Sequence, residues 1–392
     1  MMKRRVWVQV HRYTGLVLAL FLILEGLTGS ILAFNSAFDR MLNPQWYAQP
    51  KPGAVRLSLG ELAERANALE PGGMVEYLFA NPDQELVMMA PRAGKTLDFD
   101  QVFLDPWTGK ELGRRRSGYH SPAPSDIMPF VYSLHSQLAA GPTGVTILGV
   151  IALIWTIDCF ISFYLTLPAA LKGFWRRWQL AWKVRWWAGT FRLNFDLHRA
   201  GGLWLWPLLL VFAWSSVMFE LPDVFDRVTG SLMDYRSATD VVGAAHPHTA
   251  APPRLGWRDA EAAGARLLAQ QAAHRGLTIG APDSLAYIPE VGVYSYSARS
   301  NIEVRSERAD TGIWFDADTG KLRELFLPVG QHTGNSLYTW LYALHFADVG
   351  GSLAYRWFVA LAGLIVAMLS VTGVVIWLKK RQVRRRPPTS AP

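Results

Sequence analysis

Four histidines stand in two matched pairs in this sequence, and imidazole is the commonest metal ligand among protein side chains. His11 and His198 each precede an arginine and open a long apolar stretch. His135 and His345 each follow a leucine shortly before a further apolar stretch. A single histidine at such an edge simply keeps its ring hydrated, but packing does not require imidazole twice at each edge. The pattern therefore predicts ligands for a metal or a metal-containing cofactor.

Other ionisable residues accompany these pairs. Arg12 and Arg199 directly follow the first pair, where they suit either haem propionates or lipid phosphates. Glu25 and Asp158 lie inside apolar stretches, and because charge in hydrocarbon is costly, both should face the interior of a helix bundle. Each suits proton handling, a place beside a propionate, or a hydrogen bond to a neighbour.

Two further histidines form a weaker, second set of candidates. His120 and His332 also occupy matched positions in the two halves of the chain, outside the apolar stretches. They suit alternative ligation, substrate contact or a plain loop role, and a loop or supporting role is favoured. His246, His248 and His274 have no matched partner and are interpreted as surface residues.

The apolar stretches are long enough to cross a bilayer. A spanning helix needs roughly 20 mostly apolar residues. Such stretches run at about 14–35, 145–168, 200–220 and 353–378. Basic clusters flank them at the N-terminus, in 172–192 and in 379–386, which is the positive-inside pattern and predicts that both termini are cytoplasmic. This placement explains the net charge of +8 without nucleic acid as a partner.

The chain therefore divides into spans and connecting segments. We predict a cytoplasmic N-terminus and first span (1–35), a first periplasmic module (36–143), a second span (144–170), a basic Trp-rich cytoplasmic loop (171–197), a third span (198–220), a second periplasmic module (221–352), a fourth span (353–378) and a basic cytoplasmic tail (379–392). The loop should lie against membrane lipid headgroups. The lone cysteine, Cys159, excludes an intrachain disulfide and any Cys-x-x-Cys site.

The two modules look alike. Each has a helical pattern, at 59–69 and 257–274, followed by three strand-like runs, at 75–79, 85–89 and 101–104 and at 284–288, 291–298 and 312–315. The segments 105–110 and 316–321 share the pattern Asp-x-x-Thr-Gly-Lys, which suits a tight turn between strands. We therefore predict an all-α four-helix transmembrane bundle with two α+β modules, built as an internal two-fold repeat of span, module and span.

The repeat constrains how the histidines meet. Both copies start on the same side of the membrane, so a pseudo-two-fold axis should run along the membrane normal. Such an axis places His11 opposite His198, which we name the inner pair, and His135 opposite His345, the outer pair. A planar macrocycle on the axis needs two such axial ligands, and histidine binds haem iron without a thioether. Zinc fits less well, because two histidines leave it short of ligands.

The sequence also resembles the PepSY-associated transmembrane family. The resemblance covers nearly the whole chain and is carried by His-Arg-x-x-Gly-Leu at 11–16, the paired Asp-x-x-Thr-Gly-Lys segments, the Leu-His pairs ending at 135 and 345, and the basic tail. Tyr13 and Thr14 depart from the commoner tryptophan. It is most similar to iron-regulated members that include a ferric-siderophore (ferrioxamine) reductase of bacterial inner membranes. The resemblance implies PepSY-like modules, bound haem b, and electron passage from the cytoplasm to the periplasm.

Two haem b groups and four histidine ligands therefore make the chain a candidate ferric-siderophore reductase. Its partners would be a ferric siderophore in the periplasm and a quinol or cytoplasmic electron donor. One alternative is a non-enzymatic anchor whose modules bind or restrain a periplasmic protein. A carrier for the chelate is a third possibility, weakened by the expectation that no span is broken.

Overall fold

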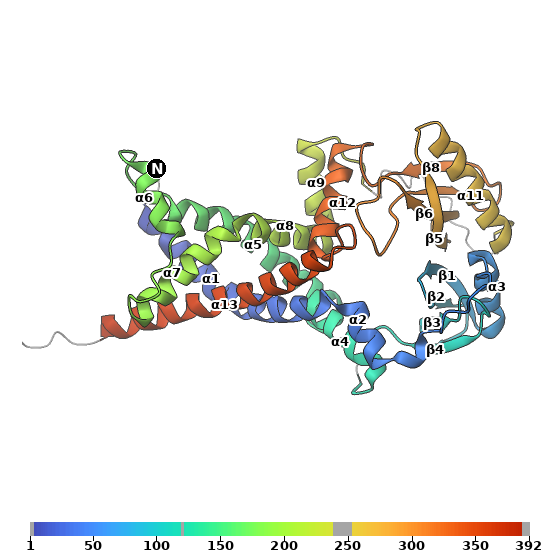
Figure 1. The fold of residues 1–392 in the computed structure, drawn as a ribbon, viewed down its shortest axis with the longest axis horizontal. Helices are drawn as coiled ribbons and strands as arrows, with labels where there is room; N and C mark the ends of the chain where they lie inside the picture. The colour runs from blue at the N-terminus through green and yellow to red at the C-terminus, as the bar shows by residue number, and fades with distance from the viewer. Residues whose placement is uncertain (1–3, 119–120, 238–252, 386–392) are drawn as a thin grey trace, which may run out of the picture.

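The computed structural model describes residues 4–118, 121–237 and 253–385. Long helices lie at one end of the molecule and a β-sheet lies at the other (Figure 1). Three helices are long and apolar enough to cross a membrane, namely α1 (Arg4–Leu32), α5 (Gly141–Thr166) and α13 (Leu353–Arg385). A fourth crossing would combine α7 (Thr190–Trp204) with α8 (Trp206–Glu220). The chain is thus a membrane protein with several apolar helices.

The third span is broken, and the expectation of unbroken spans is wrong. The axes of α7 and α8 differ by 68°. Pro207 lies in the first turn of α8, where its missing N–H costs no helical hydrogen bond, and its ring cannot continue the preceding helix. The Trp206 indole N–H, on the same turn, donates to the carbonyl of Cys159 at 2.8 Å, which ties the break to α5.

Small residues let α1 and α13 cross closely. A Cβ atom on Gly26 would lie 2.5 Å from the Gly363 carbonyl oxygen, and a Cβ on Gly363 would lie equally close to that of Gly26. The Ser30 hydroxyl donates to the Ala360 carbonyl across the same crossing, at 2.8 Å. Close backbone approach at small residues is how helices associate where no hydrophobic force drives them together.

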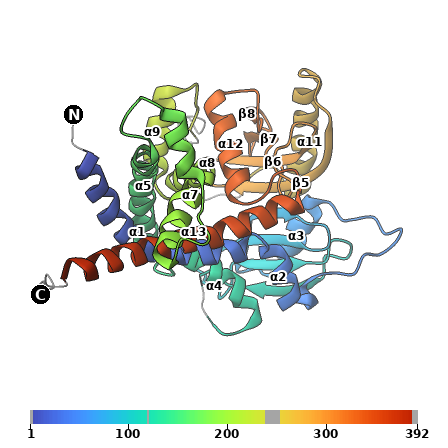
Figure 2. The ribbon, with the colours of Figure 1, turned by 60° about the vertical axis from the view of Figure 1, so that its left-hand side comes forward.

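The strands of both modules form one antiparallel sheet in the order β4-β3-β2-β1-β5-β6-β7-β8. Their bounds are β1 Gly73–Ala80, β2 Glu85–Pro91, β3 Gln101–Leu104, β4 Glu111–Arg115, β5 Ile279–Ile288, β6 Val293–Ser300, β7 Gly312–Asp316 and β8 Leu322–Phe326. The two halves join between β1 and β5, where Leu78 pairs with Leu285. Figure 2 shows the orange strands of the second half next to the blue and cyan strands of the first. Two separate modules were expected, and the sequence reasoning missed this join.

One face of the sheet is covered by α3 (Leu59–Leu69) and α11 (Trp257–Ala273), as Figure 1 shows. Between these helices and the strands lies the core, whose fully buried members include Leu62, Leu78, Leu285 and Phe315. The turn prediction is confirmed, because Asp105 accepts hydrogen bonds from the backbone of Trp107 and Thr108 and Asp316 does so from Asp318 and Thr319.

Short helices connect the sheet to the long helices. α2 (Asn35–Leu42) and the 3₁₀ turn η1 (Pro44–Trp46) continue from α1, and α9 (Pro222–Leu232) continues from α8. α4 (Pro124–Gln137) and α12 (Thr333–His345) lead into α5 and α13. At the far end, α6 (Phe174–Trp178) and the 3₁₀ turn η2 (Gln179–Trp182) form part of the basic loop.

Candidate cofactor-binding site

Both predicted histidine pairs are brought together by the fold. The rings of His11 on α1 and His198 on α7 have centroids 6.2 Å apart. Those of His135 on α4 and His345 on α12 lie 6.3 Å apart. Two metal–imidazole bonds of roughly 2 Å, with about 1 Å from each ring centre to its nitrogen, would separate ring centres by about 6 Å. Each pair is therefore spaced as two axial ligands of one metal ion would be.

Hydroxyl groups orient the outer pair. The Thr28 hydroxyl donates to the Leu24 carbonyl at 2.7 Å and lies 2.9 Å from His135 Nδ1. A hydroxyl has one proton, so the imidazole Nδ1–H must donate to Thr28. Ser215 does the same for His345, since its hydroxyl donates to Val211 and lies 2.6 Å from the ring Nδ1. In both rings Nε2 has no hydrogen-bond partner among the described residues, so it is the nitrogen available to a metal.

The inner pair is oriented by acceptors that have no proton to give. His11 Nδ1 lies 2.9 and 3.0 Å from the two carboxylate oxygens of Asp158, which also accepts from Thr14. His198 Nδ1 lies 2.9 Å from the Leu369 carbonyl. Each Nδ1 must therefore carry the proton. This arrangement, with one nitrogen donating to the protein and the other free, is typical of metal-binding histidine.

Glycines leave room for two of these rings. A Cβ atom on Gly29 would lie 3.1 Å from Cε1 of His135, and one on Gly373 would lie 3.1 Å from Cε1 of His198. Both distances are shorter than ordinary van der Waals contact. A side chain at either position would therefore displace the imidazole from its present position.

The two carboxylates predicted to face the bundle interior both contact histidine. Asp158 is buried and contacts His11, as described above. Glu25 Oε2 lies 2.9 Å from His135 Nδ1, beside the Thr28 hydroxyl. Its other oxygen is buried and has no hydrogen-bond partner among the described residues. Carboxylates of this kind make an imidazole a stronger electron donor.

The two candidate arginines, Arg12 and Arg199, have different surroundings. Arg199 donates to the Leu180 carbonyl at 2.7 Å and to Asp196 at 3.0 Å. Its guanidinium therefore forms an ion pair with Asp196. Asp196 has no exposed surface and also binds Arg185 and Arg192, a three-arginine cluster that the sequence analysis missed. Arg12 is half-buried, and no carboxylate of the described residues pairs with it. Neither arginine is held toward a histidine pair by a contact within the described part of the chain.

His332, from the second set of histidine candidates, lies away from the outer pair. His332 precedes α12, and its Nδ1 lies 2.8 Å from Asp234. The helix between it and His345, at about 1.5 Å per residue, places the two roughly 20 Å apart along the axis. Ligation of the same metal by His332 is thus excluded, and the loop role fits. His120 lies outside the described residues.

The matching of the hydroxyls could have been found from sequence. Thr28 and Ser215 are separated along the chain by the same interval as His11 and His198.

A family model for the PepSY-associated TM region matches residues 8–380. The chain belongs to this family. A search of curated proteins finds no match to this sequence.

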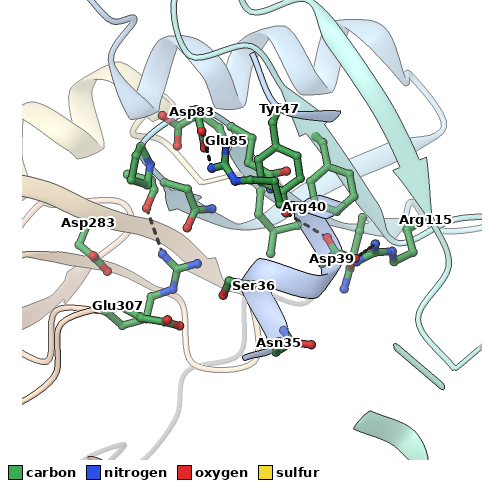
Figure 3. Close-up of a pocket in the computed structure, with 18 of the residues that line it drawn as sticks. Asn35, Ser36, Asp39, Arg40, Tyr47, Asp83, Glu85, Arg115, Asp283 and Glu307 are labelled. Carbon is green, nitrogen blue, oxygen red and sulfur yellow. Dashed lines mark hydrogen bonds and ion pairs between the residues drawn. The ribbon is translucent and has the colours of Figure 1, made fainter. Parts of the chain in front are cut away.

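In this PepSY-associated TM protein, a cavity of about 1320 Å³ lies between the sheet and the outer ends of the helices. We name it the chamber. Its walls come from α2, from strands of both halves of the sheet, from the loop before β7, and from α4 and α13. Figure 3 shows Asp39, Glu85, Asp283 and Glu307 around this shared space. Ser133 and Gln137, which flank His135 on α4, also line it.

Glu85 in the chamber wall should make the free energy of unfolding of the protein depend on pH. It is 1% exposed, and burial raises its pKa to about 7, although Arg56 beside it acts in the opposite direction. The folded protein therefore keeps a proton here that the unfolded chain releases above pH 4.5. Stability from this group is fully present below that pH and is lost as pH rises toward 7. We expect Glu85→Gln to flatten this decline in melting temperature, measured between pH 4.5 and about 8.

The control is Glu64→Gln, which changes an exposed glutamate of α3 that pairs with Arg258. It should leave the slope of melting temperature against pH as in the wild type. An equally steep decline in the Glu85→Gln protein would contradict the assignment.

Proposed function

We propose that this protein is a di-haem b transmembrane oxidoreductase that passes electrons from the cytoplasmic to the periplasmic side and reduces ferric siderophore there. The observation that carries the proposal is the pair of ring spacings, 6.2 and 6.3 Å, at two separate levels of the helices. Haem iron held by two histidines would supply one-electron transfer at each level. The inner pair would hold one haem and the outer pair the other.

The supporting residues have defined tasks in this proposal. Asp158, Thr28, Ser215 and the Leu369 carbonyl fix each imidazole in the tautomer that presents Nε2. Gly29 and Gly373 keep space beside the rings. Phe212 and Phe219 contact the His345 ring, at centroid distances of 5.5 and 5.2 Å, and help to exclude water there.

An internal duplication accounts for the paired arrangement. We infer that residues 1–185 and 186–392 are two copies of one unit, with four crossings and both termini in the cytoplasm of a bacterial inner membrane. The strand order supports the duplication. From the central pair β1 and β5, the strands β1 to β4 follow one another outward on one side, and β5 to β8 do so on the other. The equal spacing of the inner histidines and of Thr28 and Ser215 supports it as well.

The chamber would receive the ferric siderophore. Because Ser133 and Gln137 lie in its wall, a molecule bound there would contact the helix that carries His135. Reduction would convert Fe³⁺ into Fe²⁺, which binds hard oxygen ligands less tightly, and the iron would then leave the chelator. The side chains of the chamber need only bind and orient the chelate.

The deciding experiment is a reduced-minus-oxidised absorption spectrum with haem quantitation on the purified protein. We expect a b-type spectrum with two haems per chain, and reoxidation of the reduced protein on adding a ferric siderophore, with Fe²⁺ captured by a ferrous chelator. A colourless protein, even after expression with added haem, would refute the proposal.

A carrier for the intact chelate is a second candidate, because α7 and α8 form a broken span and discontinuous helices line the binding sites of many transporters. Uptake of radiolabelled chelator into proteoliposomes would distinguish it. The oxidoreductase predicts reduction without uptake of the chelator.

A further inference from the structure

The described walls of the chamber have a formal net charge of zero, counting every carboxylate as ionised, although the whole chain carries +8. Six arginines and six carboxylates line it. They are Arg40, Arg56, Arg115, Arg299, Arg308 and Arg356, with Asp39, Asp83, Glu85, Glu261, Asp283 and Glu307. The excess positive charge of the protein therefore lies elsewhere.

Ten of these twelve groups are paired with one another. Arg40 binds Asp83, and Arg56 binds Glu85. The remaining pairs are Arg115 with Asp39 at 2.6 Å, Arg299 with Asp283 at 3.3 Å, and Arg356 with Glu307 at 2.6 Å. Because each charge is met by its neighbour, the walls produce alternating potential and no field of one sign.

The remaining carboxylate, Glu261, and the remaining arginine, Arg308, form hydrogen bonds with the backbone. Glu261 accepts hydrogen bonds from the backbone of Leu59 and Gly60 at the start of α3. Arg308 donates to the Ala80 carbonyl at 3.0 Å and lies over the Phe79 ring. Neither forms an ion pair within the described residues, so these two groups contribute one positive and one negative charge to the walls.

We propose that the chamber selects ferric chelates whose own net charge is close to zero and discriminates against polyanionic ones. This inference rests on the proposed function for the identity of the ligand. Three bidentate ligands of charge −1, such as hydroxamates, cancel the charge of Fe³⁺, whereas three catecholates of charge −2 leave a trianion. A trianion entering the chamber would lose its hydration and meet six arginines, five of which are already paired with carboxylates. A neutral chelate loses little hydration and can bond to the polar groups of the wall.

Binding can be measured apart from electron transfer with gallium(III), which takes the same oxygen ligands as Fe³⁺ and is not reduced. The full-length protein in detergent would be titrated by calorimetry with a neutral gallium trihydroxamate and a trianionic gallium tris-catecholate. We expect the neutral complex to bind at least tenfold more tightly, with little change between low and physiological salt. Tighter binding of the trianion, weakening as salt rises, would overturn the inference, as would binding of neither complex.

One ion pair offers matched variants of opposite charge. Glu307→Gln gives the chamber a net positive charge and Arg356→Gln a net negative charge, while both break the same pair. We expect them to change affinity for the neutral complex equally, and to change affinity for the trianion in opposite directions, by several-fold. Equal effects on the trianion would show that chamber charge does not select the ligand.

Reduction of the corresponding ferric complexes then tests the proposed function separately. If the neutral gallium complex binds as expected but the ferric complex does not reoxidise the reduced protein, the chamber is a chelate site and the reductase proposal fails. If the ferric trianion is reduced as fast as the neutral complex at equal concentration, the charge selection fails and the reductase proposal stands.

Discussion

Replacing His345 with alanine should remove about half of the bound haem and leave the inner haem in place. The His345 ring faces His135 at 6.3 Å, and its Nδ1 is fixed by Ser215, so no other described histidine is placed to take over its role. Only one of the two histidines that would bind the outer haem iron, His135, would then remain, which should weaken retention of that haem. Haem quantitation by the pyridine method and the reduced-minus-oxidised spectrum measure the loss.

The chain supplies a matched control at the start of the same helix. His332→Ala removes a histidine that precedes α12 and contacts Asp234, and it should keep the full haem content. His198→Ala should show the converse loss, of the inner haem alone. If His345→Ala and His198→Ala each remove both haems or neither, the assignment of ligands to two separate sites is wrong.

The residues that meet in these pairs could be foreseen because membrane geometry restricts where they can be. A span fixes the depth of His11 and His198 at its start, and matched segments place their equivalents at equal depth. On the proposed duplication, a shared axis is enough to bring equivalent residues of the two copies face to face. The turn at Asp105 was equally predictable, because a carboxylate two and three residues before backbone N–H groups defines that turn locally.

Features that depend on contacts distant in sequence could not be foreseen in this way. The pairing of Leu78 with Leu285 joins strands from opposite halves of the chain, and neither strand has a signal that distinguishes an edge from a centre. β4 and β8 were missed because their charged residues resemble a loop, although edge strands often carry such charges. The charge balance of the chamber arises from several separate segments, and their sum is invisible in any one of them.

The break at Pro207 was not predicted, although its cause is local. That cause was visible in the sequence, where proline follows Trp206 in the middle of an apolar stretch. Hydropathy alone predicts one continuous span there, because proline barely changes the average. The steric rule for proline, applied to the residue itself, would have predicted the break between α7 and α8.

Changing Asp158 to asparagine should raise the reduction potential of the inner haem and leave that of the outer haem unchanged. Both oxygens of Asp158 lie within 3.0 Å of His11 Nδ1, and the residue is buried, so its negative charge acts on the ring with little screening. A carboxylate acceptor makes the imidazole more electron-rich, which stabilises ferric over ferrous iron. Asparagine keeps an acceptor oxygen but removes the charge. We expect a rise on the order of 60 mV, a tenfold change in a one-electron equilibrium.

Glu25→Gln is the matched test at the other level, because Glu25 lies 2.9 Å from His135 Nδ1 as Asp158 does from His11. It should raise the potential of the outer haem alone. Electron flow toward the chamber requires the inner haem to be the stronger reductant, so Asp158→Asn reduces the driving force and should slow transfer, whereas Glu25→Gln increases it. Spectroelectrochemical titration of each variant separates the two potentials. A shift of both potentials by either variant, or of neither, would show that these carboxylates do not tune the irons individually.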